Sequence, residues 1–164
     1  MLCSRSSFTP FNTTRRPRFP DFVVRHRGQL VCWRGIADGG AIMDNRVVLV
    51  GTDDARLAEQ ILAAARAIGL EGEWGADGVD ILELAERNTP LVVFLDVSLG
   101  GLSARECCES LRNTVYFPRD CPVYLLTDDP VPAEKLEKMG FYDTWPKQRE
   151  SNALRELLAK LMWK

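Results

Sequence analysis

Apolar runs of strand length alternate with stretches of helical spacing from residue 46 to the end of the chain. Two of these runs, VVLV at 47–50 and LVVFL at 91–95, are apolar without interruption. Continuous runs of this kind are typical of strands that are buried on both faces of a sheet. The predicted strands are 47–50, 71–75, 91–95, 123–126 and 141–145.

Apolar residues at helical spacing lie between and after these strands. The clearest sets are Leu57, Ile61, Ala64 and Ile68; Ala104, Cys107, Cys108 and Leu111; and Leu154, Leu157, Leu158 and Leu161. Spacings of three, four and seven residues place each set on one face of a helix. Shorter helices are predicted around residues 81–85 and 136–139, and Ser103 with Glu106 forms a capping box that predicts a helix start.

Strand–helix units in strict alternation predict a single α/β domain. Parallel strands need crossover connections, and right-handed crossovers cover both faces of the sheet with helices. We therefore expect a doubly wound, five-stranded parallel sheet. In sheets of this kind, ligands bind at the carboxyl ends of the strands.

Polar side chains follow four of the predicted strands. They are Thr52 and Asp53 after the first strand, Asp96 after the third, Thr127 and Asp128 after the fourth, and Lys147 after the fifth. Two ionised carboxylates about 5 Å apart repel by roughly 3 kcal/mol at an effective dielectric constant near 20, so Asp53 and Asp96 need positive charge beside them. A divalent metal ion and the Lys147 ammonium group would supply it.

Four segments in order resemble the signature segments of the receiver domain of two-component response regulators. They are VVLVGTDDARLAEQIL, LVVFLDVSLGGLSARE, PVYLLTDDP and GFYDTWPKQ, and together they span about residues 45–164. The resemblance implies a flavodoxin-like fold with strand order 2-1-3-4-5. It also implies that Asp96 accepts a phosphoryl group from a histidine kinase or a phosphotransfer protein.

The resemblance also implies a role for each polar residue at the strand ends. Asp53 matches a carboxylate ligand of Mg²⁺, and the backbone carbonyl of Ser98 would be a further ligand beside Asp96. Thr127 and Lys147 match the residues that contact the phosphoryl oxygens. Mg²⁺ and a lysine would neutralise the charge on those oxygens, so that a carboxylate can act as the nucleophile.

Five positions depart from the pattern that the resemblance implies. Thr52 replaces the first acid of a pair, so we expect Mg²⁺ to bind more weakly. Gly51 replaces a bulky strand residue, so we expect looser local packing. Asp128 replaces a small residue and would either repel the phosphoryl group or recover a metal contact. Thr144 replaces the switch aromatic residue, and Gln148 replaces the proline after the lysine.

The first 43 residues differ in charge from the rest of the chain. They contain seven arginines and two acids, a net charge of +5, whereas residues 44–164 contain 14 basic and 21 acidic residues, a net charge of −7. Three prolines interrupt the early segment, which has no sustained periodicity. We therefore predict a basic, low-structure extension over residues 1–43 and a receiver domain over residues 44–164.

Three interpretations of the extension are open. It could be a targeting peptide, a basic arm for nucleic acid or anionic lipid, or upstream sequence that is not part of the native protein. We favour the last, because Met43 stands just before the first clean strand. The acidic body argues against a nucleic-acid partner.

Composition narrows the class of protein further. Five cysteines without CxxC spacing predict a cytoplasmic protein without a disulfide framework or a zinc site, and no apolar stretch approaches the roughly 20 residues of a membrane span. The only histidine is His26, and neither GxGxxG nor GxxxxGK[ST] occurs, so we expect that the protein is not an enzyme.

Two functions remain open from the sequence. The first is a single-domain receiver, phosphorylated on Asp96, which signals by docking a downstream protein or a second copy. The chain ends after the last predicted helix, so we expect no output domain. Docking would use the face of the fourth helix, fifth strand and fifth helix, where Trp145 or Trp163 offers a contact unless it belongs to the core. The second is a pseudo-receiver that binds proteins without phosphorylation.

Overall fold

The computed structural model describes residues 22–26, 29–33 and 46–164. The chain divides into two compact units, Met1–Ile42 and Met43–Lys164. Among the described residues, no helix combines the length and apolar character that a bilayer span requires.

The first unit contains a short antiparallel hairpin of β1 (Phe22–His26) and β2 (Gln29–Trp33). This hairpin was not predicted, because residues 1–43 show no sustained strand or helix periodicity. The local signal for it is the content of β-branched and aromatic residues in FVVRH and QLVCW, which favours strands once two such runs pair. Whether residues 1–43 belong to the native protein stays a prediction.

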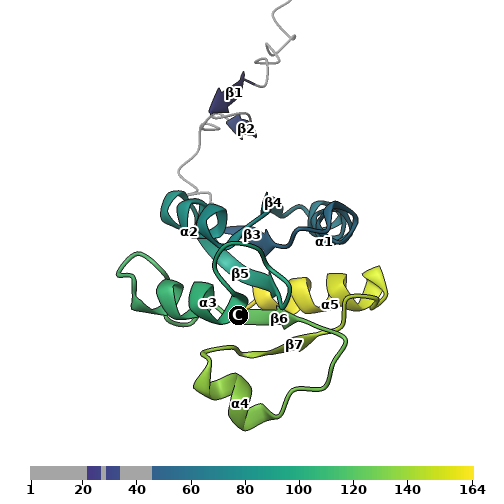
Figure 1. The fold of residues 1–164 in the computed structure, drawn as a ribbon. Coiled ribbons are helices and arrows are strands. Elements are labelled where there is room, and N and C mark those ends of the chain that lie inside the picture. Colours follow the sequence, from purple (N-terminus) through teal and green to yellow (C-terminus); the bar gives the residue numbers. More distant parts are fainter. Residues whose placement is uncertain (1–21, 27–28, 34–45) are drawn as a thin grey trace, which may run out of the picture. The chain divides into compact units, whose positions relative to one another are not determined.

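The second unit is built on a parallel sheet (Figure 1). Its strands are β3 (Arg46–Gly51), β4 (Glu71–Gly75), β5 (Thr89–Asp96), β6 (Val123–Leu126) and β7 (Asp143–Trp145). Their order in the sheet is β4–β3–β5–β6–β7, and every neighbouring pair is parallel. Numbered from the first strand of this unit, the order is 2-1-3-4-5, so the predicted flavodoxin-like fold is confirmed.

The last strand is shorter than the predicted 141–145. Gly140 has a φ of 82°, and the backbone N–H of Phe141 donates to the carbonyl of Leu136 at 3.0 Å. This pairing closes the end of a helix in the manner of a Schellman motif. Phe141 therefore belongs to a helix terminus, and β7 begins only at Asp143.

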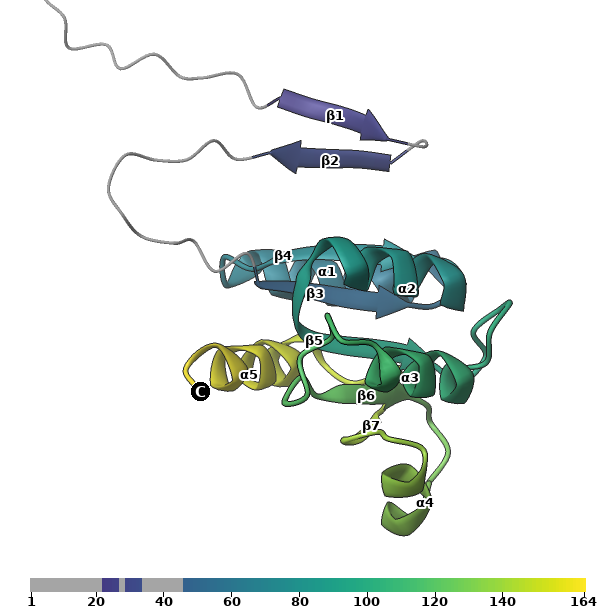
Figure 2. The ribbon, with the colours of Figure 1, turned by 90° about the vertical axis from the view of Figure 1, so that its left-hand side faces the viewer.

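Helices cover both faces of the sheet (Figures 1 and 2). They are α1 (Ala55–Ala67), α2 (Gly78–Arg87), α3 (Ala104–Asn113), α4 (Ala133–Lys138) and α5 (Ser151–Met162). Helices α1 and α5 pack on one face, α2 and α3 on the other, and α4 contacts β7. The predicted capping box is present, with Ser103 and Glu106 bonding to each other's backbone N–H.

The two central strands are buried on both faces, as their apolar sequences predict. The side chains of β3 and β5 that belong to the cluster under α1 and α5 are Val48, Val50, Val92 and Phe94. Those that belong to the cluster under α2 and α3 are Val47, Leu49, Val93 and Leu95. This burial fixes the register of both strands, because a slip of one residue would exchange the two sets.

Gly51 does not loosen the packing, and the expectation that it would was wrong. A Cβ atom at this position would lie 2.9 Å from Ile81 Cγ1 and 3.0 Å from Leu95 Cδ2. Neighbouring side chains therefore fill the space that a larger residue would occupy. Glycine is needed because Ile81 of α2 approaches the β3 backbone closely.

Candidate functional site

Thr52, Asp96 and Thr127 are the buried polar side chains in the described part of the chain. They follow or end β3, β5 and β6, which are neighbours in the sheet, so all three lie at its carboxyl edge. Burying a polar group costs free energy unless it is hydrogen-bonded. Every buried side-chain nitrogen and oxygen among the described residues has such a partner.

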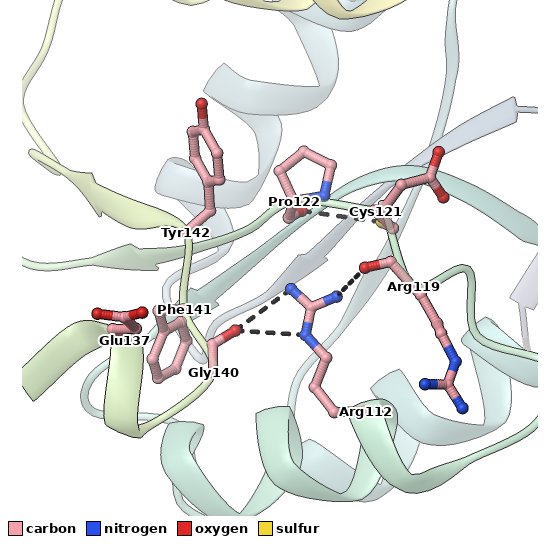
Figure 3. Close-up of a pocket in the computed structure, with 9 residues that line it drawn as sticks. Arg112, Arg119, Cys121, Pro122, Glu137, Gly140, Phe141 and Tyr142 are labelled. Carbon is pink, nitrogen blue, oxygen red and sulfur yellow. Dashed lines mark hydrogen bonds between the residues drawn. The ribbon is translucent and has the colours of Figure 1, made fainter.

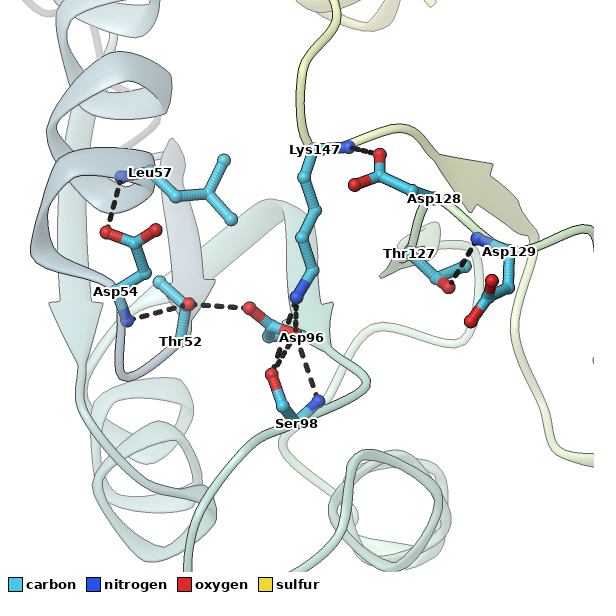
Figure 4. Close-up of polar contacts among 9 residues, drawn as sticks. All are labelled: Thr52, Asp54, Leu57, Asp96, Ser98, Thr127, Asp128, Asp129 and Lys147. Atoms are coloured by element: carbon cyan, nitrogen blue, oxygen red, sulfur yellow. Dashed lines mark hydrogen bonds and ion pairs between the residues drawn. The ribbon is translucent and has the colours of Figure 1, made fainter.

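The Asp96 carboxylate accepts hydrogen bonds on both of its oxygens (Figure 4). Oδ2 accepts from the Thr52 hydroxyl at 2.8 Å. Oδ1 accepts from the Ser98 backbone N–H at 3.0 Å and from the Ser98 hydroxyl at 2.8 Å. Lys147 Nζ lies 2.6 Å from the same Oδ1 and donates to Ser98 Oγ at 3.4 Å. The structure thus brings three predicted site residues together and adds Thr52 to them.

These donors decide the charge of Asp96. Burial by itself would raise the pKa of this carboxyl, because it disfavours the charged form. The Lys147 ammonium group, the Ser98 amide and the Thr52 and Ser98 hydroxyls outweigh burial and hold the pKa of Asp96 below its usual value. Asp96 is therefore ionised at neutral pH, the state that a nucleophilic carboxylate needs.

Thr52 is held in place by the backbone around it. Its hydroxyl oxygen accepts the N–H of Asp54 at 3.1 Å, and its carbonyl accepts the indole N–H of Trp74 in β4 at 2.7 Å. With its oxygen occupied in this way, the hydroxyl donates its proton to Asp96. From the sequence, Thr52 was expected to weaken metal binding, and its donation to Asp96 was not predicted. The contact from Trp74 was not foreseen, because it depends on the pairing of β3 with β4.

Thr127 and Asp128 begin the turn after β6. The Thr127 backbone N–H donates to the carbonyl of Trp145 at 3.1 Å, and its hydroxyl accepts the N–H of Asp129 at 3.1 Å. The Asp128 carboxylate accepts the backbone N–H of Lys147 at 2.9 Å. In this arrangement the Thr127 hydroxyl is engaged within its own turn, and Asp128 is engaged with the loop that carries the lysine (Figure 4).

The oxygens at this edge match Mg²⁺ in chemical type but form a sparse set. Asp53 is exposed, and no hydrogen-bond or ion-pair partner reaches its side chain from the described residues. Within the same part of the chain, no three His, Cys, Asp or Glu side chains form a metal-binding group. Carboxylate and carbonyl oxygens are the ligands that Mg²⁺ prefers, and Mg²⁺ usually keeps several waters. Position 52, where the resemblance implies a further acid, is a threonine and adds no carboxylate.

A separate pocket of about 390 Å³ lies at the opposite edge of the sheet, before β6 and β7 (Figure 3). The Arg112 guanidinium group donates there to the carbonyl of Gly140 at 3.3 and 3.2 Å and to the carbonyl of Arg119 at 3.2 Å. These bonds join the end of α3 to the turns before β6 and β7. The pocket contains none of the predicted site residues.

The two tryptophans expected near the output face differ in burial. Trp145 is 7% exposed and packs against Phe94 and Tyr124 in the core. Trp163, at the end of α5, is 88% exposed. Trp163 is therefore the one of the two that is available for a contact.

Comparison with known proteins gives one sequence relative and many structural neighbours. No protein-family model matches the chain. The chain is 32% identical over 116 residues to the response regulator MprA of Mycobacterium leprae (strain TN), a match that covers 70% of this chain and 48% of that protein. The chain thus spans about half the length of the curated relative that it matches.

Solved structures of receiver domains share the fold. The chemotaxis response regulator CheY4 of Vibrio cholerae superposes with a TM-score of 0.64 at 20% identity, over 71% of this chain and 98% of that one. The receiver domain of the sensor histidine kinase PA1611 of Pseudomonas aeruginosa PAO1 gives a TM-score of 0.63 at 21% identity, over 73% and 98%. The latter structure has a magnesium ion coordinated in its active-site cleft.

Proposed function

We propose that this chain is a phosphorelay receiver that accepts a phosphoryl group on Asp96. The sequence similarity to a response regulator and the fold that residues 46–164 share with receiver domains support the proposal. The observation that carries the proposal is the contact of 2.6 Å between Lys147 Nζ and Asp96 Oδ1 at a buried strand end. This contact places an ionised carboxylate directly beside a cation. Phosphoryl transfer depends mainly on such positioning and charge neutralisation.

In the proposed reaction, an Asp96 oxygen attacks the phosphorus of a phosphohistidine. The new P–O bond forms as the P–N bond breaks, and the leaving imidazole takes up a proton. Lys147 remains beside the new acyl phosphate and offsets its negative charge. Asp53, Asp96 and the Ser98 carbonyl would hold Mg²⁺, which when bound neutralises charge on the transferring oxygens.

The Thr127 hydroxyl would respond to the new charge. Its oxygen now accepts the N–H of Asp129, and turning toward the phosphoryl group would replace that bond by a charge-assisted one. This movement would alter the turn after β6, which leads into α4. A local charge change would in this way alter a docking surface.

The partners follow from the same proposal. The phosphoryl donor would be a histidine kinase or a phosphotransfer protein, which would approach through a cleft of about 550 Å³ beside Lys147. The cleft is lined by α1 residues, including Arg56 and Gln60, and by the loop before α5. Output would be docking of a downstream protein in the cytoplasm, with Trp163 as a contact, and the domain would catalyse no reaction on other substrates.

The second candidate function is a pseudo-receiver that binds its partner without phosphorylation. Two observations favour it. Thr52 stands where a metal-binding acid is expected, and side-chain and backbone donors of the protein already bond to both oxygens of Asp96.

Incubation with acetyl phosphate and Mg²⁺, followed by intact mass measurement, separates the two candidates. The expected result is one added phosphoryl group on the wild-type protein and none on Asp96→Asn. A receiver that phosphorylates itself under the same conditions provides the positive control. If that control is modified while the wild-type chain stays unmodified, the pseudo-receiver is the correct function.

A further inference from the structure

We propose that Asp128 is a positioning residue for Lys147, because its carboxylate holds the backbone from which the lysine side chain reaches Asp96. The inference rests on the proposed role of Asp96 as phosphoryl acceptor. It assigns a function to a residue for which the sequence left two opposite roles open, repulsion of the phosphoryl group and recovery of a metal contact.

The Asp128 bond lies where the pairing of β6 with β7 ends. The Thr127 N–H donates to the carbonyl of Trp145, which is a rung of a parallel ladder. In a parallel ladder the next rung would run from the N–H of Lys147 to the backbone carbonyl of Thr127. The N–H of Lys147 is bonded instead to Asp128 Oδ1 at 2.9 Å. The Asp128 side chain thus takes the place of a backbone acceptor. It bonds the first backbone N–H after Pro146, which has none of its own.

Lys147 is consequently held at both of its ends (Figure 4). Its backbone N–H is bonded to Asp128, and its Nζ contacts Asp96 and Ser98. A lysine side chain has many rotamers, so its ammonium group is only as well placed as the backbone that carries it. Gln148 follows the lysine in this chain, so no proline restrains the loop at that point.

The geometry gives Asp128 a role that differs in kind from the two earlier ones. Its Oδ1 is committed to an N–H donor on the side of the lysine backbone. Repulsion of the phosphoryl group and binding of a metal ion both depend on the charge of the carboxylate. A bond to a backbone N–H depends only on an acceptor oxygen, which an asparagine also provides. Charge and acceptor can therefore be separated by substitution.

Three variants make the test: Asp128→Ala removes the acceptor, Asp128→Asn keeps an acceptor oxygen without the charge, and Asp129→Ala is the matched control. Asp129 lies in the same turn with the same charge, and it is the backbone N–H of Asp129 that bonds to Thr127. The first measurement is amide hydrogen exchange at Lys147 in the unphosphorylated proteins. The second is the rate of phosphorylation by acetyl phosphate with Mg²⁺, followed by intact mass.

We expect amide exchange at Lys147 to be about fivefold faster in Asp128→Ala, because one ordinary hydrogen bond is lost. The exchange rate in the other two variants should stay close to that of wild type. The phosphorylation rate at saturating acetyl phosphate should fall by a similar factor in Asp128→Ala. Asp128 lines the cleft beside Lys147, but a positioning role acts through the lysine backbone and not through donor binding. The acetyl phosphate concentration that gives half of that rate should therefore stay unchanged. Recovery of both values in Asp128→Asn supports positioning through the hydrogen bond.

Two results would overturn the inference. Unchanged exchange at Lys147 in Asp128→Ala shows that the bond does not hold the loop. If Asp128→Asn and Asp128→Ala lower the phosphorylation rate equally, the charge of Asp128 matters and the acceptor oxygen does not. If the wild-type chain accepts no phosphoryl group, the proposed function fails, and the exchange measurement still decides whether Asp128 holds Lys147.

Discussion

Lys147 Nζ lies 2.6 Å from Asp96 Oδ1, although Asp96 ends the central strand β5, Lys147 follows the outer strand β7, and the two differ in exposure. The Asp96 side chain is 1% exposed, whereas that of Lys147 is 28% exposed. The acid is therefore buried and the cation reaches it from the surface. Such a pair depends on both partners, because a buried carboxylate without its cation is costly.

Replacing Lys147 by methionine should lower the free energy of unfolding. Loss of one partner costs about 3–5 kcal/mol for a fully buried pair and about 0–1 kcal/mol for an exposed one, so we expect about 2 kcal/mol here. Urea unfolding at neutral pH measures the change. In a protein that already carries Asp96→Asn, the same substitution should cost little. An equal drop in the free energy of unfolding with and without Asp96→Asn would contradict a role for the ion pair.

The stability of the protein should depend on the charge of Asp96 at acid pH. The pKa of Asp96 is held below its usual value in the folded state, so folding favours the ionised form. This stabilisation is present in full above about pH 5 and is lost as the pH falls below about 3.9 through the folded-state pKa. Urea unfolding from about pH 5 to well below about pH 3.9 should show a steeper loss of unfolding free energy for wild type than for Asp96→Asn.

Asp96→Asn also provides the control for other acids. Hydrogen bonds from the Ser103 hydroxyl and backbone N–H lower the pKa of Glu106, and this group titrates in both proteins. The difference between the two curves therefore isolates Asp96. Parallel curves would show that Asp96 has the same pKa in the folded and unfolded chains.

Replacing Thr52 by aspartate should make the stability depend on Mg²⁺. The Thr52 side chain is fully buried and donates to Asp96, so a carboxylate there would repel Asp96 by about 3 kcal/mol at 5 Å and an effective dielectric constant near 20. Mg²⁺ that binds both carboxylates would offset this repulsion. Thermal unfolding with and without Mg²⁺ should show a larger rise for Thr52→Asp than for wild type.

Thr52→Asn is the matched control, since it adds a polar group without charge. It should show no gain in Mg²⁺ response over wild type. An equal response of Thr52→Asp and Thr52→Asn to the cation would argue against position 52 as the determinant of metal affinity.

Replacing Gly51 by valine should destabilise the fold. A side chain at this position would overlap Ile81 and Leu95, which already fill the space. Overpacking of a well-filled core costs about 1–3 kcal/mol. The free energy of unfolding from urea titration gives the cost, and Gly69→Ala offers a comparison at a glycine with open space but a positive φ of 82°. A stabilising effect of valine would mean that the packing around β3 is loose after all.

The fold and the location of the candidate site could be predicted from the chain alone. Uninterrupted apolar runs such as 91–95 require burial on both faces, and their alternation with helical spacing permits few topologies. A parallel sheet then gathers the residues after its strands, so Asp96 and Lys147 could be placed at one edge without coordinates.

Only the tertiary structure decided how the polar groups in that site are bonded. The donation from Thr52 to Asp96, the acceptor role of Asp128 and the burial of Trp145 all depend on the register of neighbouring strands. Hydrogen bonds require atoms within about 3 Å in the correct direction, and no spacing along the chain determines that between residues far apart in sequence. The pattern therefore specifies which residues meet, and packing specifies which atoms bond.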